Sequence, residues 1–344
     1  MTALTYKGMQ YESGAGESVL DTLLRNKIDI PYSCKAGACN ICMMVGDEKE
    51  LISHATHGIK NTLVEQGHFL ACQCVVTDPI TVHEAEDVSV FCQAIVNDKD
   101  FLSDKVCRLR LHPAIGLYYR AGQYINIRMP NGQIRSYSLA SLPTEDDYLE
   151  LHIKRMDGGL MSNWLLDEVQ QGDTLEIQGA YGDCYYLSED QDCDIVMIGT
   201  GTGLAPLVGI LRDAITSGHK GQIKLYHGER EASGLYFDTE LKALSAAHSN
   251  IHYFPCASED ADNSEQAIHS GRAADYAFAS NKNLAGNLVY LCGSPQMVKS
   301  ARKMAYLAGA SMKQIYSDPF VTKDIRQTSD QKSPIDKSVE RRHN

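Results

Sequence analysis

Features of membrane-spanning, exported and nucleic-acid-binding proteins are missing from this sequence of 344 residues. No apolar run approaches ~18 residues, the length at which a membrane-spanning helix is expected. There is no basic tract, and a formal net charge of −12 argues against binding to nucleic acid. The N-terminus, MTALTYKGMQ, does not join a charged start to an apolar run, so we expect no signal peptide. The sequence also lacks an internal repeat, and its length favours two or three globular domains.

Cysteine is plentiful for a chain in which no export signal is recognised. Eleven cysteines could form disulfides in a secreted protein, but without such a signal we expect reduced thiols in the cytoplasm. Residues 322–344 are polar and contain no Phe, Tyr or Trp, so we expect a disordered tail there.

Three cysteines lie within the stretch SCKAGACNIC, with the spacing Cys34-x4-Cys39-x2-Cys42. A Cys-x2-Cys pair alone also serves zinc sites and dithiol switches. A structural zinc site would bring a second close pair, but one residue separates the downstream cysteines, Cys72 and Cys74. The spacing is that of plant-type [2Fe–2S] proteins, and small residues in the loop let backbone N–H groups approach the sulfides. The motif therefore favours a [2Fe–2S] cluster, with zinc as the alternative.

The segment that contains these cysteines, residues 1–88, resembles a β-grasp ferredoxin domain. In that family the fourth ligand follows the third after about 29 residues in a Leu-x-Cys setting, which Leu70-Ala71-Cys72 matches. The resemblance thus implies Cys34, Cys39, Cys42 and Cys72 as cluster ligands, and it leaves Cys74 in the core of a strand. The family's Gly after the second cysteine is replaced here by Asn40, which tolerates positive φ best among non-glycine residues.

Residues 89–190 contain several short strand patterns separated by turns, which predict an antiparallel β-barrel. One strand carries Arg135-Ser136-Tyr137-Ser138, and a loop at 158–162, GGLMS, precedes an amphipathic run. A strand Arg can pair with a pyrophosphate, and the aromatic two positions on can lie flat on an isoalloxazine. Ser138 needs a local twist to reach flavin N5. Glycines ahead of a helix offer backbone N–H groups to phosphates.

Together the two motifs resemble the ferredoxin–NADP reductase superfamily, which implies bound FAD. By that resemblance Arg135 binds the pyrophosphate, Tyr137 stacks on the ring and Ser138 lies near N5. In that family a further strand lines the cofactor, and here that strand holds His152, Ile153 and Lys154. A plain strand of the barrel would account for these three residues equally well. The implied contacts in addition to Arg135, Tyr137 and Ser138 are Ser136, His152, Ile153, Lys154, Gly158, Gly159, Leu160, Met161 and Ser162.

Residues 191–321 alternate between strand and helix patterns, which predicts a parallel sheet with ligands at the carboxyl ends of its strands. The loop Gly199-Thr200-Gly201-Thr202-Gly203 fails the Rossmann fingerprint, because the third glycine position holds Leu204 or Pro206. Pro206 can start a helix, and the tight loop ahead of it can still hold a pyrophosphate.

This loop and Cys292-Gly293-Ser294-Pro295 resemble the nicotinamide domain of the same superfamily. The resemblance places Cys292 and Gly293 near the nicotinamide, the alternative being a buried thiol at a strand end. IYSDPF resembles the family's aromatic C-terminal ending, where Phe320 would close over the flavin or nicotinamide site. The expected catalytic residues are thus Tyr137, Ser138, Cys292 and Phe320.

The order of the three segments resembles the one-component reductases of dioxygenases and soluble monooxygenases. Nicotinamide gives two electrons at once and the cluster accepts one, so FAD must stand between them. We therefore expect an NAD(P)H-dependent electron-transfer enzyme that serves a separate oxygenase. The alternatives are a reductase for a deoxysugar dehydratase system and, less favoured, a redox sensor. In NADPH-using members of the family that this chain resembles, an Arg binds the 2′-phosphate, and Glu259 occupies that place here. NADH is therefore expected over NADPH, although Arg230 could supply the missing charge.

Overall fold

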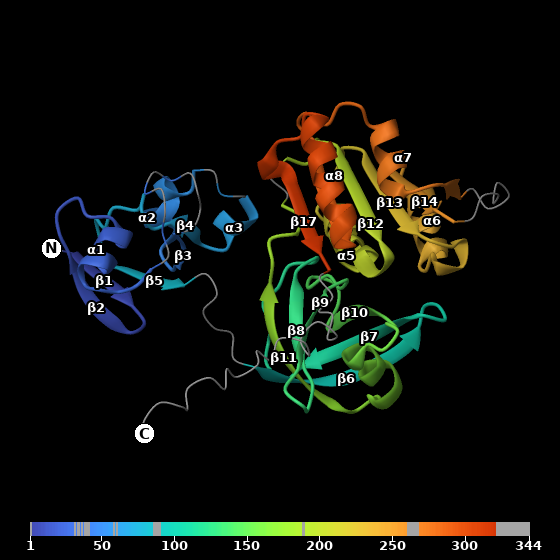
Figure 1. Ribbon diagram of the computed structural model, residues 1–344, viewed down its shortest axis with the longest axis horizontal. Helices are drawn as coiled ribbons and strands as arrows, with labels where there is room; N and C mark the ends of the chain where they lie inside the picture. The colour runs from blue at the N-terminus through green and yellow to red at the C-terminus, as the bar shows by residue number, and fades with distance from the viewer. Residues whose placement is uncertain are drawn as a thin grey trace, which may run out of the picture.

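A computed structural model describes residues 2–320, apart from 31, 33, 34, 36, 38–41, 58, 60, 85–90, 188, 189 and 260–267. Three β-sheets follow one another along the chain (Figure 1). Cys34, Cys39 and the tail 322–344 lie outside the described residues. Across the part of the chain that is described, no helix is both long and apolar enough to cross a membrane.

The first module is a five-stranded sheet in the order β2-β1-β5-β3-β4, with β1 and β5 parallel. Ser18 is the N-cap of its longest helix, because its side chain accepts a hydrogen bond from Asp21 N at 3.1 Å. Val19, Leu20 and Leu23 of this helix are buried against the sheet. The elements are β1 (Thr2–Tyr6), β2 (Met9–Ser13), α1 (Val19–Arg25), β3 (Met43–Gly46), α2 (Lys49–Ile52), α3 (Asn61–Glu65), β4 (His68–Leu70) and β5 (Ile80–Glu84).

The second module is a six-stranded sheet in the order β10-β7-β6-β11-β8-β9, with every neighbouring pair antiparallel. A bridge between Leu139 and Leu151 brings the two end strands together, which closes the sheet into the expected barrel. The elements are β6 (Cys92–Phe101), β7 (Val106–Pro113), β8 (Tyr124–Arg128), β9 (Ile134–Ser138), β10 (Leu149–Lys154), α4 (Leu160–Asn163), a π-helical turn (Trp164–Glu168) and β11 (Thr174–Tyr181).

The third module is a six-stranded parallel sheet in the order β15-β14-β13-β12-β16-β17. Side chains of β12 alternate between its faces: Met197 packs with α5 and α6, whereas Val196 and Ile198 pack with α7 and α8. The elements are β12 (Ile195–Thr200), α5 (Leu204–Thr216), β13 (Ile223–Glu229), α6 (Asp238–Ala247), β14 (Ile251–Ala257), β15 (His269–Ser270), α7 (Ala273–Ser280), β16 (Leu288–Gly293), α8 (Pro295–Leu307) and β17 (Ile315–Pro319).

The helix after the glycine loop starts earlier than Pro206. α5 begins at Leu204, directly after a 3₁₀ turn at Gly201–Gly203, so Pro206 lies inside its first turn. The missing N–H of proline costs little there, because the first N–H groups of a helix have no intrahelical partner.

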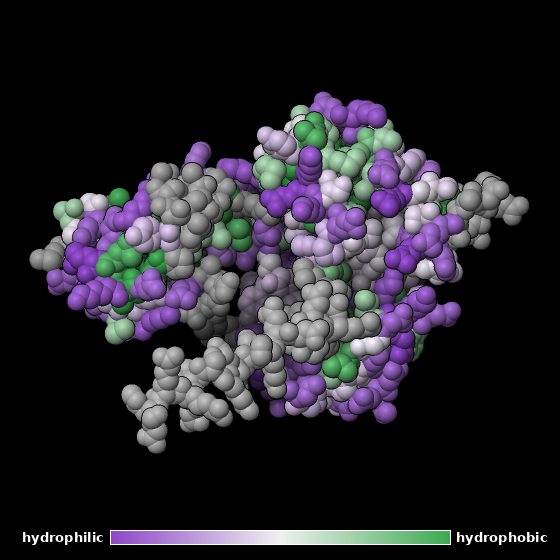
Figure 2. Space-filling view, viewed as in Figure 1, coloured by the Kyte–Doolittle hydropathy of each residue, from purple (hydrophilic) through white to green (hydrophobic). Residues whose placement is uncertain are grey.

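The barrel and the parallel sheet meet along α5. A Cβ at Gly209 would lie 3.0 Å from Leu139 O of the barrel, so the helix backbone packs directly on the end of β9. Arg212 of the same helix pairs with Asp146 at 2.6 Å and with Glu145 at 3.0 Å. The first module forms a separate lobe beside these two, and on the face shown its apolar areas are small (Figures 1 and 2).

Candidate electron-transfer site

Two of the predicted cluster ligands flank neighbouring strands: Cys42 directly precedes β3, and Cys72 follows the end of β4. Met43 pairs with Leu70, and Ala71 N donates to Cys42 O at 3.0 Å, which brings Cys42 and Cys72 side by side in the backbone. Gln73 Nε2 lies 3.3 Å from Cys72 Sγ and donates to it. Two thiols beside the adjoining ends of β3 and β4, with an N–H directed at one sulfur, fit the donor set of an iron–sulfur cluster.

Cys74 has the surroundings of a core residue. It is 1% exposed, and its sulfur contacts Leu51 O at 3.8 Å. Burial raises the pKa of its thiol to about 11, which opposes the thiolate form that a metal ligand needs. This environment supports the assignment of Cys72 as the ligand.

Strand β9 carries the predicted flavin residues at the edge of the barrel. Tyr137 is half-buried and packs on the barrel core, and burial raises the pKa of its hydroxyl. Arg135 Nη1 donates to Ile134 O at 2.7 Å, and Ser136 Oγ donates to Asn126 Oδ1 at 2.7 Å. The strand thus offers a guanidinium and an aromatic ring two residues apart, the pattern expected of a flavin pyrophosphate and ring site.

The predicted phosphate loop is built tightly around Gly159. Gly158 has φ +68°, and a Cβ at Gly159 would lie 2.6 Å from Ser162 Oγ. Ser162 Oγ accepts from Met156 N at 3.2 Å, which folds the loop back on itself. Leu160 is exposed and Met161 packs in the barrel core, so these two frame the loop. Only glycine fits at 159 without displacing a neighbour, which keeps the backbone N–H groups at the start of α4 accessible.

The two predicted nicotinamide motifs touch each other at the carboxyl ends of β12 and β16. A Cβ at Gly203 would lie 2.3 Å from Cys292 O, and one at Gly293 would lie 2.5 Å from Thr200 O. Ser294 N donates to Thr200 Oγ1 at 3.0 Å. The loops at 199–203 and 292–294 therefore form one surface of closely packed backbone, which suits a pyrophosphate and a flat ring.

Three of the predicted catalytic residues, Ser138, Cys292 and Phe320, come together beside this surface. Cys292 is fully buried and pairs in register with Asp318 of β17, and Ser138 Oγ donates to Asp318 Oδ2 at 2.7 Å. Burial is the largest effect on both acids and raises the pKa of the Cys292 thiol and of the Asp318 carboxyl, while the bond from Ser138 acts the other way on Asp318. Phe320 N donates to Gly293 O at 2.8 Å, which fixes the chain after β17 next to the nicotinamide loop.

Asp318 is a candidate that the sequence analysis missed. Its partner Ser138 lies 180 residues away, so no local pattern joins them. The available signal was an acidic residue two positions before the aromatic ending, in IYSDPF.

The three predicted residues of β10 have different surroundings. Lys154 Nζ pairs with Glu229 at 2.7 Å and lies 3.4 Å from the position of a Cβ on Gly201, so it reaches the nucleotide loop. His152 is buried between Glu150, at 3.1 Å, and Tyr236 of the third module, at 3.1 Å. Ile153 is 1% exposed in the barrel core, as a plain barrel strand would have it.

Glu259 and Arg230 lie together after β14 and β13. Glu259 N donates to Arg230 O at 2.8 Å, and Arg230 Nε is 3.9 Å from Glu259 Oε1. Both side chains are exposed, 84% for Arg230 and 61% for Glu259. The acidic Asp260 and Asp262 lie outside the described residues.

Comparison with known proteins identifies the modules. The family model "2Fe-2S iron-sulfur cluster binding domain" matches residues 4–77, "Oxidoreductase FAD-binding domain" matches 93–186, and "Oxidoreductase NAD-binding domain" matches 197–303. Reductase component 2 of terephthalate 1,2-dioxygenase from Comamonas is 30% identical over 315 residues, which cover 89% of this chain and 93% of the relative. The chain belongs to this family of iron–sulfur flavoprotein reductases.

The reductase is similar along most of its length to further members. The reductase component of the naphthalene 1,2-dioxygenase system of Pseudomonas putida is 30% identical over 312 residues, 89% of this chain and 94% of the relative. The crystal structure of Amycolatopsis cytochrome P450 reductase GcoB matches with a TM-score of 0.66 at 30% identity, covering 94% of this chain and 99% of that one. The ferredoxin reductase in carbazole 1,9a-dioxygenase, at 24% identity and a TM-score of 0.62, shares the fold over 93% of this chain and 98% of its own.

These matches confirm the predicted fold class, enzyme class and cofactors. The reductase is an oxidoreductase with domains for a [2Fe–2S] cluster, FAD and a nicotinamide nucleotide, which we now call the ferredoxin, FAD-binding and NAD-binding domains. FAD converts the two electrons of NAD(P)H into the single electrons that a cluster accepts. The individual site residues and the preference for NADH stay predictions.

Proposed function

We propose that the reductase takes electrons from NADH and supplies them to a separate oxygenase component. The observation that carries this proposal is the similarity, at 30% identity over about nine-tenths of both chains, to the reductase components of terephthalate and naphthalene dioxygenases. An aromatic O-demethylase reductase subunit from Amycolatopsis is equally similar, which keeps the class of oxygenase open. We infer domain boundaries near residues 88 and 190 and a cytoplasmic location, in keeping with cysteines such as Cys74 and Cys107 that remain thiols in the structure.

In this proposal the chain's own groups position the nucleotide and manage a proton. The loops around Gly203 and Gly293 hold the nicotinamide end, and Arg135, Tyr137 and the Gly159 loop hold FAD. A hydride brings two electrons and a proton, and when the electrons leave singly the proton has to be taken up. Ser138 Oγ, bonded to Asp318 Oδ2, is the group that we assign to accept and pass on that proton.

The preference for NADH follows from the charges after β14. Glu259 is close enough to Arg230 to offset part of its positive charge, and the exposed carboxylate can accept a bond from a ribose 2′-OH. A 2′-phosphate would meet the same carboxylate as a like charge.

A second candidate acceptor is a deoxysugar dehydratase. The CDP-6-deoxy-L-threo-D-glycero-4-hexulose-3-dehydrase reductase of Yersinia pestis is 30% identical over 334 residues, 91% of this chain and 96% of the relative. Its resemblance is as strong as that of the oxygenase reductases, so sequence identity alone does not separate the two acceptors.

Reconstitution separates the two candidates. The purified reductase, with NADH, is combined either with an oxygenase component encoded beside its gene or with a dehydratase of this type. NADH consumption coupled to oxygenated product supports the proposal. Coupled turnover with the dehydratase and none with the oxygenase would replace it with the second candidate.

A further inference from the structure

Tyr185, between β11 and β12, contacts all three domains. Its side chain is fully buried, and its hydroxyl donates to Thr62 O of the ferredoxin domain. Arg120 of the FAD-binding domain lies over its ring, with Cζ 5.2 Å from the centroid. Tyr290 of the NAD-binding domain donates to Tyr185 O at 3.3 Å. One residue therefore joins the parts of the chain that carry the three cofactors.

A second side chain strengthens this junction from the ferredoxin side. Gln66 Nε2 donates to Gly182 O at 3.1 Å and to Tyr185 Oη at 3.3 Å. Burial raises the pKa of the Tyr185 hydroxyl to about 12, so it stays protonated and able to donate. The bond from Tyr185 to Thr62 O is buried, and such a bond is costly to break because it leaves a group without water or a partner.

The junction lies between the predicted cluster ligand and the hydride site. On one side, the chain runs from α3 and Gln66 through the three residues of β4 to Cys72. On the other side, Cys184 is adjacent to Tyr185, and its sulfur lies 3.7 Å from that of Cys292. Movement of Tyr185 relative to α3 would change the separation between the cluster and the flavin.

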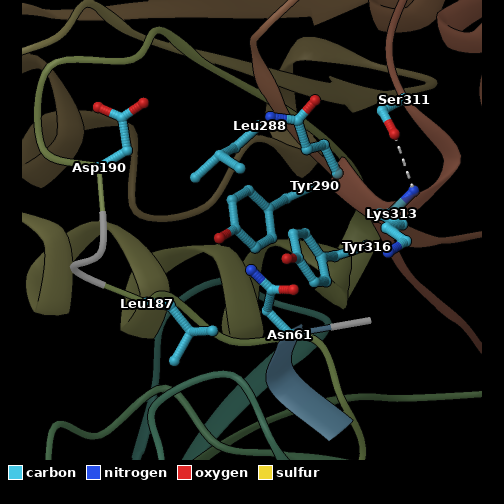
Figure 3. A pocket seen from close by; sticks show the side chains of 9 residues that line it. Asn61, Leu187, Asp190, Leu288, Tyr290, Ser311, Lys313 and Tyr316 are labelled. Atoms are coloured by element: carbon cyan, nitrogen blue, oxygen red, sulfur yellow. Dashed lines mark hydrogen bonds between the residues drawn. The ribbon is translucent and has the colours of Figure 1, made fainter. Parts of the chain in front are cut away.

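A cavity and an exposed ion pair lie near the junction among the described residues. A cavity of about 270 Å³ lies beside it, lined by Asn61 of the ferredoxin domain and by NAD-binding-domain residues that include Tyr290 and Tyr316 (Figure 3). The ion pair between Arg120 and Glu65 has side chains that are 41% and 40% exposed, and exposed pairs contribute little. The bond from Tyr185 to Thr62 O, in contrast, is buried.

We propose that Tyr185 is a positioning residue that holds the ferredoxin domain against the junction of the other two domains for electron transfer from FAD to the cluster. The inference rests on the order FAD before cluster and is independent of the final acceptor. It makes the hydroxyl of Tyr185 important for the internal electron step and unimportant for hydride transfer from the nucleotide.

The test compares Tyr185→Phe with Tyr186→Phe in the full-length holoprotein. Both tyrosines are buried, but the hydroxyl of Tyr186 bonds to His219 of the NAD-binding domain, at 3.0 Å, and not to a residue of the ferredoxin domain. For Tyr185→Phe we expect flavin-to-cluster transfer, followed by anaerobic stopped-flow absorbance, to fall roughly five- to tenfold, the effect of losing one net hydrogen bond. NADH–ferricyanide kcat and KM should stay at wild-type values. Hydrogen exchange should rise at residues 61–67, and Tyr186→Phe should show neither change.

Two further variants keep the inference testable if Tyr185→Phe folds poorly. Gln66→Ala removes the second tie from the ferredoxin side and should slow the same step and raise the same exchange, whereas Glu65→Gln should leave both nearly unchanged. Equal flavin-to-cluster rates in wild type, Tyr185→Phe and Gln66→Ala would overturn the inference. Parallel losses of ferricyanide and cluster reduction would also overturn it, since they would place Tyr185 in the flavin or nucleotide site.

Discussion

The hydroxyl of Ser138 donates to the carboxylate of Asp318 at 2.7 Å, joining the barrel to the last strand of the NAD-binding domain. Cys292 lies opposite Asp318 in the same sheet. This pair puts a proton-accepting group where flavin and nicotinamide are expected to meet. The bond between Ser138 and Asp318 also links the FAD-binding and NAD-binding domains, which have to hold the flavin and nicotinamide rings against each other.

Asp318→Asn should slow turnover by at least roughly tenfold, because an amide cannot take up the proton that the flavin releases. The amide oxygen can still accept the bond from Ser138, so the local geometry is retained. Steady-state NADH–ferricyanide rates check this, with the neighbouring Ser317→Ala as the control. Unchanged rates in Asp318→Asn would remove the carboxylate from the proton path.

The same substitution should change the pH dependence of stability. Burial raises the pKa of Asp318 above its ordinary value of 3.8, so the folded state holds this proton more tightly than the unfolded state. The stabilising contribution of this group is therefore complete below that ordinary value and is lost as pH rises through the raised pKa. The amide of the Asp318→Asn variant is neutral throughout, so the Tm of the variant relative to wild type should increase as pH rises above the ordinary value of 3.8. A difference in Tm between variant and wild type that does not change with pH would show that Asp318 titrates normally.

The cysteine assignment predicts opposite results for two close neighbours. Cys72→Ser should abolish the visible cluster absorbance, whereas Cys74→Ser should retain it, because Cys74 is buried in the core beside Leu51. NADH–ferricyanide activity should survive in Cys72→Ser, since the flavin precedes the cluster. Loss of cluster absorbance in the Cys74 variant alone would reverse the assignment.

Much of the fold followed from local patterns. The cysteine spacing, the Arg-x-Tyr-Ser strand and the glycine loop at 199–203 each combine residue type with position, and the family models match the domains that they predicted. The cap of α1 is equally local, because Ser18 accepts from Asp21 N only three residues away.

The residues that join domains could not be found in this way. Ser138 and Asp318, or Tyr185 and Thr62, are brought together only by the packing of separate sheets. The partners of His152, Glu150 and Tyr236, were likewise not visible in the sequence, and the cofactor contact that the resemblance implies for His152 stays a prediction. The start of α5 was placed too late because Pro206 is tolerated within a first turn as well as at its beginning.

Nucleotide choice should favour NADH over NADPH by on the order of tenfold in kcat/KM, which corresponds to about 1.4 kcal/mol. The physical reason is the exposed Glu259, which offsets Arg230 and repels a 2′-phosphate. Glu259→Gln should reduce the ratio of kcat/KM for NADH to kcat/KM for NADPH. Arg230→Ala should lower kcat/KM for NADPH more than for NADH. Both nucleotides have to be measured at the same salt concentration. Preference for NADPH in the wild-type reductase would show that Arg230 outweighs the carboxylate.

The central claim is that electrons pass from NADH through FAD to the [2Fe–2S] cluster. It is tested most directly by mixing the holoprotein with NADH under anaerobic conditions while following flavin and cluster absorbance, together with the electron paramagnetic resonance of the cluster. The account predicts that flavin absorbance falls first and that a paramagnetic reduced cluster then appears, whereas Cys72→Ser shows the flavin step alone. Cluster reduction that precedes flavin reduction, or a cluster that stays oxidised while the flavin is fully reduced, would contradict it.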